Sequence, residues 1–199
     1  VVADLDIASH GLSLADMDTV FQTGNLAIGK DECTLREMVD AMNAIYCGSI
    51  GIEYMHIVDT AQKRWIQQRL EGKRGQPGYS VEIKKDLLEQ VTAAEGLEKY
   101  LGTKFAGAKR FGLEGGESLI PMIDELIQRA GSYDTKEVVI GMAHRGRLNV
   151  LVNILGKKPA NLFDEFAGKM FNQTGSGDVK YHQGYSSNVM TPGGEMHLA

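Results

Sequence analysis

A short β-branched run between two helix-like stretches constrains the fold of this chain more than any other feature. The run is Val138-Val139-Ile140. Apolar residues recur at helical spacing before it, in residues 118–130, and after it, in residues 148–155. Such a run suits a strand buried on both faces of a parallel sheet. The order helix, strand, helix therefore predicts an α/β architecture, with a central parallel strand over about residues 138–142.

The first half of the chain is predicted to be mainly helical. The pattern Thr34-x-x-Glu37 is a capping box, and apolar residues follow it at helical spacing. Residues 60–70 and 84–101 also have helical spacing. The composition changes near residue 102, where glycines become frequent. We therefore expect a mainly helical region over residues 1–101 and the start of an α/β domain, truncated, over residues 102–199.

The composition excludes several classes of function. Of the 199 residues, 43% are hydrophobic and 24% are charged, as in ordinary globular proteins. A net charge of −5 argues against nucleic acid and acidic membrane surfaces as partners. The two cysteines, Cys33 and Cys47, lack the spacing of a zinc site and fit a reducing compartment. The chain begins at Val1 and ends in a strand-like run at Ala199, so we expect an internal piece of a longer protein.

The segment 141–149, GMAHRGRLN, carries the densest candidate chemistry. It lies between the predicted strand and a predicted helix, where open α/β sheets bind ligands. His144, Arg145 and Arg147 would meet there, and arginine can bind a phosphate or a carboxylate through two hydrogen bonds. An anion site is one interpretation. The equally open alternative is that these arginines pair with surface carboxylates.

A second candidate segment is 177–187, GDVKYHQGYSS. His182 lies there in a polar loop and could transfer a proton or donate a hydrogen bond to a carboxylate. From spacing alone, a histidine in such a loop is more often the hydrogen-bond partner of a nearby carbonyl group. His197 lies in the terminal strand-like run and, taken alone, is typical of a core or edge histidine.

Several long motifs together resemble one enzyme family. GMAHRGRLNVLVNILGKKPANLFDEFAGK, GDVKYHQGYSS and GGEMHLA occur in the order seen in the first, decarboxylating component of bacterial-type 2-oxoglutarate dehydrogenase. YCGSIGIEYMHI and KRFGLEGGESLIPM, which lie upstream, resemble the same family. The resemblance implies a parallel-sheet domain that binds thiamine diphosphate and Mg²⁺. It also implies oxidative decarboxylation of 2-oxoglutarate, with succinyl transfer to a lipoyl group.

The resemblance also implies roles for individual residues. Arg145 would contact the cofactor diphosphate, and His144 would lie against the substrate or the thiamine-bound intermediate. His182 would contact the substrate carboxylate or assist proton transfer, at the same pocket as His144. His197 would line the same cavity. The family's metal motif, Gly-Asp-Gly followed later by Asn, is absent, and residues 177–179 do not replace it, so no metal ligand is assigned.

The wider context implied is a homodimer in the bacterial cytoplasm, with the mitochondrial matrix as the alternative. Its partner would be the lipoyl-bearing dihydrolipoyl succinyltransferase. Three other functions stay open: a 2-oxoadipate dehydrogenase, a 2-oxoglutarate decarboxylase relative, and a non-catalytic phosphate-binding module in which Arg145 and Arg147 hold a ligand. The sequence that follows Ala199 would separate the enzymes from the module.

Residues 1–199 alone should neither bind thiamine diphosphate tightly nor decarboxylate 2-oxoglutarate. A diphosphate is normally held through a divalent metal as well as cationic side chains. Without that metal, Arg145 would have to offset the cost of removing a highly charged group from water. Calorimetric titration with cofactor and magnesium tests this expectation, and micromolar binding would contradict it.

Overall fold

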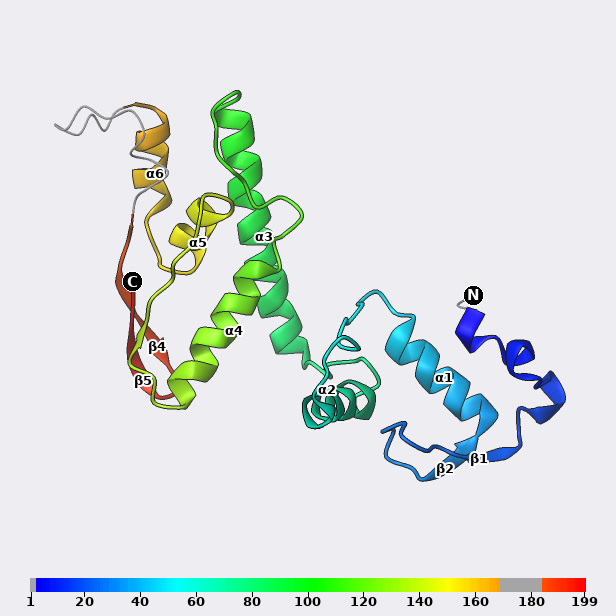
Figure 1. Cartoon of the computed structure of the whole chain (residues 1–199). Coiled ribbons are helices and arrows are strands. Elements are labelled where there is room, and N and C mark those ends of the chain that lie inside the picture. Colours follow the sequence, from blue (N-terminus) through cyan, green and yellow to red (C-terminus); the bar gives the residue numbers. More distant parts are fainter. Residues whose placement is uncertain (1–2, 169–183) are drawn as a thin grey trace. The chain divides into compact units, whose positions relative to one another are not determined.

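The computed structural model describes residues 3–168 and 184–199 and divides the chain into two compact units (Figure 1). Unit 1 is Val1–Tyr79 and unit 2 is Ser80–Ala199. The long helix α3 (Val81–Lys104) falls in unit 2 because it packs against two later helices of that unit. The compact units are thus divided earlier than residue 102, where we expect the cofactor-binding domain to begin. That functional boundary stays a prediction.

Unit 1 combines short turns, a two-stranded hairpin and two helices. Its elements are three 3₁₀ turns (Ala3–Leu5, Ile7–His10, Leu14–Asp16), β1 (Val20–Gln22), β2 (Glu32–Thr34), α1 (Leu35–Tyr46) and α2 (Thr60–Gly72). The predicted capping box is confirmed, since Thr34 Oγ1 accepts from Glu37 N at 3.2 Å and Glu37 Oε2 accepts from Thr34 N at 3.2 Å. Two orphan backbone donors are satisfied in this way, and the helix start is fixed.

A buried carboxylate connects the loops of unit 1 to α2. Glu71 is only 2% exposed. Its Oε2 accepts from Ala27 N at 2.6 Å, and its Oε1 accepts from Tyr46 Oη at 2.5 Å and from Gln67 Nε2 at 2.9 Å. The hydroxyl groups of Tyr46 and Tyr54 are 3.1 Å apart. A buried carboxylate is costly unless it is hydrogen-bonded. This network therefore fixes where α2 meets the loop at Ala27 and the end of α1 at Tyr46.

Unit 2 is a mixed α/β arrangement. After α3 come α4 (Leu119–Ser132), β3 (Glu137–Val138), α5 (Arg147–Asn153), α6 (Pro159–Phe166), β4 (Ser187–Thr191) and β5 (Gly194–Leu198). The strand order is β3-β5-β4, with β3 parallel and β4 antiparallel to β5. Figure 1 shows α4 and α5 between the strands and α3. The predicted α/β class is confirmed, but the sheet is mixed.

The expectation of a central strand over residues 138–142 is wrong in length and in burial. β3 has two residues and lies at the edge of the described sheet, although Ile140 N extends its pairing by donating to Ala199 O at 2.7 Å. Val139 is 72% exposed. A β-branched run indicates a local preference for extended backbone. Burial on both faces depends instead on which other segments of the chain pack against the strand.

The core of unit 2 is shared by its helices and one face of the sheet. Met196 and Leu198 of β5 are at most 1% exposed and belong to one cluster with apolar side chains of α3, α4, α5 and α6. The alternate residues of β5 point to the other face, as the two-residue period of a strand requires. The core therefore lies on one side of the sheet.

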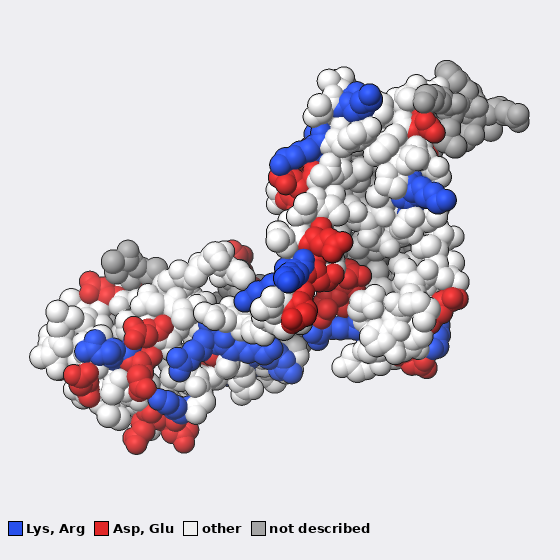
Figure 2. All heavy atoms as spheres, turned by 180° about the vertical axis from the view of Figure 1, so that it is seen from behind, with Lys and Arg blue, Asp and Glu red and all other residues white. Residues whose placement is uncertain are grey.

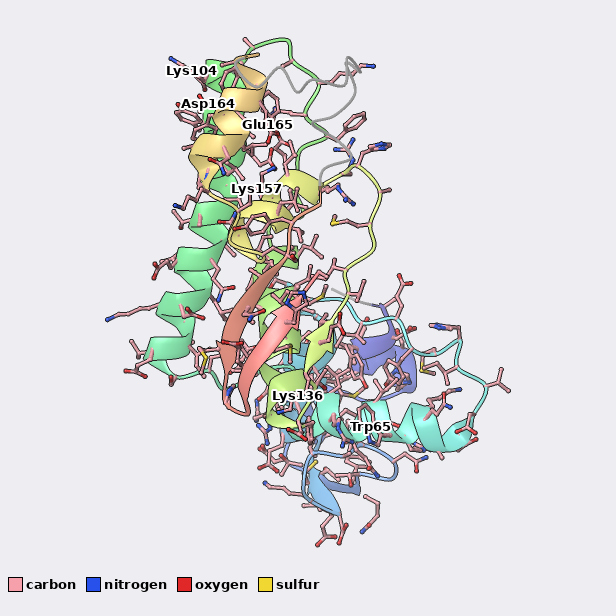
Figure 3. All side chains as sticks on the ribbon, turned by 90° about the vertical axis from the view of Figure 1, so that its left-hand side faces the viewer. Trp65, Lys104, Lys136, Lys157, Asp164 and Glu165 are labelled. Atoms are coloured by element: carbon pink, nitrogen blue, oxygen red, sulfur yellow. The ribbon has the colours of Figure 1, made fainter. Side chains whose placement is uncertain are left out.

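A buried ion pair secures the segment between α5 and α6. Lys157 and Glu165, both labelled in Figure 3, are joined by a Nζ–Oε1 contact of 3.1 Å, and each side chain is 7% exposed.

On the surface, acidic and basic side chains are intermixed over the face seen in Figure 2. No helix of the described residues is long and apolar enough to cross a membrane.

The β4–β5 turn lies directly against the end of α4. A Cβ atom on Gly131 would lie less than 3.0 Å from Thr191, and one on Gly193 would lie less than 3.0 Å from the Gly131 carbonyl oxygen. The sequence suggests that Gly131 follows the end of its helix. It instead lies inside α4, where the absence of a side chain permits this close approach.

Replacing Gly131 with Ala should lower the free energy of unfolding by about 1–3 kcal/mol, the usual cost of overpacking. Urea denaturation checks this. Gly96→Ala is the matched control, because Gly96 is an exposed position inside α3 with open space around its Cα. Alanine there should stabilise by roughly 0.5–1 kcal/mol. Equal effects of the two substitutions would contradict the close packing of the turn on α4.

Alkaline pH should weaken unit 1 through Tyr46. Burial, and next the hydrogen bond to Glu71, raise the pKa of Tyr46 above its ordinary value. In the unfolded chain a tyrosine loses its proton near about pH 10. The stabilisation that the protonated Tyr46 hydroxyl gives the folded state is therefore fully present below that pH. It is lost as the pH rises towards the higher pKa that Tyr46 has in the folded protein.

Thermal unfolding between pH 8 and pH 11 measures this effect. Tyr46→Phe should be less stable at pH 8 but should lose less stability than the parent as the pH rises. Tyr133→Phe, at an 85% exposed site, should keep the parental pH dependence. Parallel curves for the parent and Tyr46→Phe would refute the role of Tyr46.

Candidate functional site

The candidate segment lies where the described parallel strands end. Residues 139–146 connect β3 to α5, and β5 ends beside them, since Ala199 N donates to Val138 O at 3.0 Å. Open α/β sheets bind ligands beyond the carboxyl ends of their strands. His144 and Arg145 therefore follow the strand end, as the sequence predicts, even though that strand is short and at an edge.

Gly146 lets this loop meet a second segment, residues 110–113. It has a φ of +75°, which disfavours other residues, and a Cβ there would lie 2.8 Å from Leu113 Cδ1. Its N–H donates to Phe111 O at 2.9 Å. The second segment, which comes from far earlier in the sequence, thus forms the floor on which the His144–Gly146 turn lies.

Arg145 is exposed but anchored. Its Nη1 donates to Gly112 O at 3.1 Å, which takes one of the five N–H donors of a guanidinium. The pKa of Glu114 is lowered, first by its own backbone N–H, then by Arg110, and also by the charge of Arg145. Arg145 is thus a permanent cation at the strand ends, and its hydrogen bond to Gly112 O orients the guanidinium. This geometry suits a phosphate or carboxylate ligand.

His144 is also exposed, and its ring stacks on that of Phe111. The centroids are 5.1 Å apart and the planes are inclined by 29°. Phe111 has a φ of +44°, a conformation that is rare for a bulky residue and is often found at functional sites. Sequence reasoning did not single out Phe111. Only its place in the KRFGLEGG motif could have indicated it, because its conformation has no signature in residue spacing.

Arg147 does not share the position of Arg145. It is half-buried, and its Nη1 donates to Met142 O at 2.8 Å. Its charged side chain lines a small cavity at the strand ends. The other residues that line this cavity are mainly apolar and include Val150 and Leu151 of α5, Met142, Tyr185 and Ala199. His144 and Arg145 are not among the residues that line it. The two arginines of the motif therefore differ in exposure and in surroundings.

His197 lies on the outer face of the sheet. It is exposed, between the buried Met196 and Leu198, and its Nδ1 is 2.7 Å from Asn188 Oδ1 on β4. The interpretation as a core or edge histidine is wrong, because β5 is the middle strand and the side chain points away from the core. Its expected place in a shared cavity stays a prediction.

His182 lies outside the described residues, so its convergence with His144 stays a prediction. Among residues 3–168 and 184–199, no group of three or more His, Cys, Asp or Glu side chains could hold a metal ion. Both cysteines are free thiols, Cys33 buried and Cys47 exposed.

Comparison with known proteins gives close relatives over almost the whole chain. The chain is 66% identical over 197 residues to the 2-oxoglutarate dehydrogenase E1 component of Azotobacter vinelandii. The aligned region covers 99% of this chain and 21% of that protein. It is 57% identical over 196 residues to that of Cupriavidus necator (98% and 21%) and 46% identical over 197 residues to that of Haemophilus influenzae (99% and 21%). No protein-family model matches. The chain spans about a fifth of the length of these curated relatives.

Proposed function

We propose that this chain, which is homologous to bacterial 2-oxoglutarate dehydrogenase E1 components, supplies part of the thiamine-diphosphate site of such an enzyme. The observation that carries the proposal is the anchored guanidinium of Arg145 at the carboxyl ends of β3 and β5. An exposed arginine with one N–H fixed by a carbonyl group can direct its other donors at a diphosphate. The longer protein would decarboxylate 2-oxoglutarate and transfer the succinyl group to a lipoyl group.

The residues of this chain would divide the work by charge. Arg145, which stays protonated at any working pH, would hold the diphosphate. Thiamine diphosphate, when bound, supplies the electron sink that lets a 2-oxo acid lose carbon dioxide. Its Mg²⁺ would have ligands elsewhere in the longer protein, since none is assigned to these residues. Glu114 lies in the field of Arg145 and would offset part of its attraction for an anion.

The histidines would serve the substrate instead. His144, on the same turn as Arg145, would lie against the substrate, with its ring face supported by Phe111. His182 would donate a hydrogen bond to the substrate carboxylate or exchange a proton, and His197 would line the cavity. Imidazole suits these tasks because it can gain or lose a proton near neutral pH.

The longer protein would work as a homodimer in the bacterial cytoplasm. Its partner would be the dihydrolipoyl succinyltransferase that carries the lipoyl group. Steady-state rates with 2-oxoglutarate and with 2-oxoadipate distinguish the proposed substrate from its closest rival, because the two differ by one methylene. A higher kcat/KM for 2-oxoadipate would overturn the substrate assignment while leaving the cofactor assignment intact.

In the full-length enzyme, Arg145→Ala should chiefly weaken the cofactor, whereas His182→Ala should chiefly lower the turnover of 2-oxoglutarate. Loss of one donor to a reacting group commonly costs on the order of a hundredfold in rate. Kinetics with cofactor and substrate titrated separately measure both effects. The expected pattern is a raised KM for cofactor in the first variant and a lowered kcat in the second.

Matched controls come from the same chain. Arg129 forms an exposed i,i+4 pair with Glu125 on α4, and His10 lies on an exposed turn of unit 1. Arg129→Ala and His10→Ala should leave both parameters within the error of measurement. If His182→Ala kept the parental kcat and KM, His182 would be a structural histidine. If Arg145→Ala kept the parental cofactor KM, the proposed diphosphate contact would be wrong.

A further inference from the structure

We propose that Glu98 is a positioning residue that sets the direction of Arg145 through the segment 110–113. The inference rests on the function proposed above for Arg145. Glu98 belongs to α3, lies 3% exposed beneath this segment, and is outside every motif to which the sequence assigns chemistry.

The two oxygens of Glu98 join three parts of unit 2. Oε1 accepts from Leu113 N at 2.9 Å and from Asn149 Nδ2 of α5 at 3.1 Å. Oε2 accepts from Arg110 Nη1 at 2.6 Å. Each end of the segment 110–113 is therefore tied to the same carboxylate, and one of its oxygens also reaches the helix that follows the candidate site.

The segment passes this constraint on to the site. Gly112 O receives the hydrogen bond from Arg145, Phe111 O receives the one from Gly146, and the Phe111 ring stacks on His144. Gly112 and Leu113 are neighbours, so the route from Glu98 to the guanidinium runs through a short stretch of backbone. A change in the carboxylate should therefore move the anchor of Arg145.

Gly112 shows how closely the segment lies on these charges. A Cβ on it would lie 2.6 Å from Glu98 Oε2 and 2.6 Å from Arg110 Nη1. Arg110 also pairs with Glu114. A side chain at position 112 would have to displace the Glu114 carboxylate and the Glu98–Arg110 ion pair, so the absence of a side chain at Gly112 lets the segment pack closely on these charges.

Loss of the carboxylate charge should act locally. Asn149 Nδ2 also donates to Ala94 O at 2.9 Å, so α5 remains tied to α3 without Glu98. In Glu98→Gln, a single carbonyl oxygen replaces two acceptors. It cannot serve Arg110 on one side and Leu113 and Asn149 on the other. The segment 110–113 should loosen while the helices beneath it stay packed.

The test uses the full-length enzyme and hydrogen–deuterium exchange measured by mass spectrometry. Peptides covering residues 141–148 contain the amide of Gly146, which reports its bond to Phe111. Glu98→Gln should speed exchange there. It should also raise the cofactor KM by about tenfold, the lower end of the loss seen when outer partners of metal ligands are removed. At saturating cofactor, kcat should stay within about twofold because bound cofactor restores the arrangement.

Glu71→Gln is the control for the burial of a carboxylate, since Glu71 is 2% exposed and also accepts from a backbone N–H. It should lower the melting temperature without changing exchange in residues 141–148 or the cofactor KM. If Glu98→Gln does not fold, Gly112→Ala disturbs the same segment from its other side. That variant should give the same faster exchange and weaker cofactor binding.

The outcomes separate this inference from the proposed function. Faster exchange with weaker cofactor binding supports both. Faster exchange with an unchanged cofactor KM supports the link from Glu98 to the Arg145 loop but overturns Arg145 as the diphosphate ligand. Unchanged exchange in both Glu98→Gln and Gly112→Ala overturns the inference.

Discussion

Burial of the Glu98 carboxylate is the constraint on which the candidate site of this protein depends. A charge removed from water must be matched by a cation and by hydrogen-bond donors, and breaking such a set is far more costly than disturbing an exposed pair. Arg110 and Leu113 N, both of the segment 110–113, and Asn149 of α5 supply these partners. The need to satisfy one carboxylate therefore brings the segment 110–113 and the start of α5 to a single place. The exposed turn that carries His144 and Arg145 takes its position from them.

Unit 1 uses the same device for a different purpose. Glu71, as deeply buried as Glu98, receives a backbone N–H from the loop after β1 and a tyrosine hydroxyl from the end of α1. Its partners are neutral, whereas one partner of Glu98 is an arginine. Neutral donors can hold a loop in place. The charged groups of a buried ion pair, here Glu98 and Arg110, also act electrostatically on the groups packed beside them. Of these two carboxylates, Glu98 is the one that lies under a segment contacting a candidate ligand-binding side chain, Arg145.

Local signals in the sequence predicted the local structure well. The capping box at Thr34 and Glu37 marks a helix start that is confirmed, because this signal acts through backbone groups a few residues apart. The run at Val138 predicted an extended segment but not its short pairing or its exposure, since these depend on β5, about sixty residues later. For the same reason spacing could not indicate Glu98 or Phe111, whose importance arises from contacts with distant segments. The motif resemblance named Arg145 and His144 but gave no account of what holds them.

The two arginines of the HRGR motif show why a motif must be read in three dimensions. In the sequence, Arg145 and Arg147 are equivalent cations on either side of a glycine. The left-handed turn at Gly146 sends them to different surroundings. Arg147, at the first position of α5, donates back to Met142 O and is half-buried beside an apolar cavity, so moving it towards an anion would cost that bond and that packing. Arg145 gives up nothing of this kind, because it is exposed and its bond to Gly112 only orients it. A site that needs one guanidinium free to meet a charged ligand, and a second one to hold the loop in shape, requires the glycine between them.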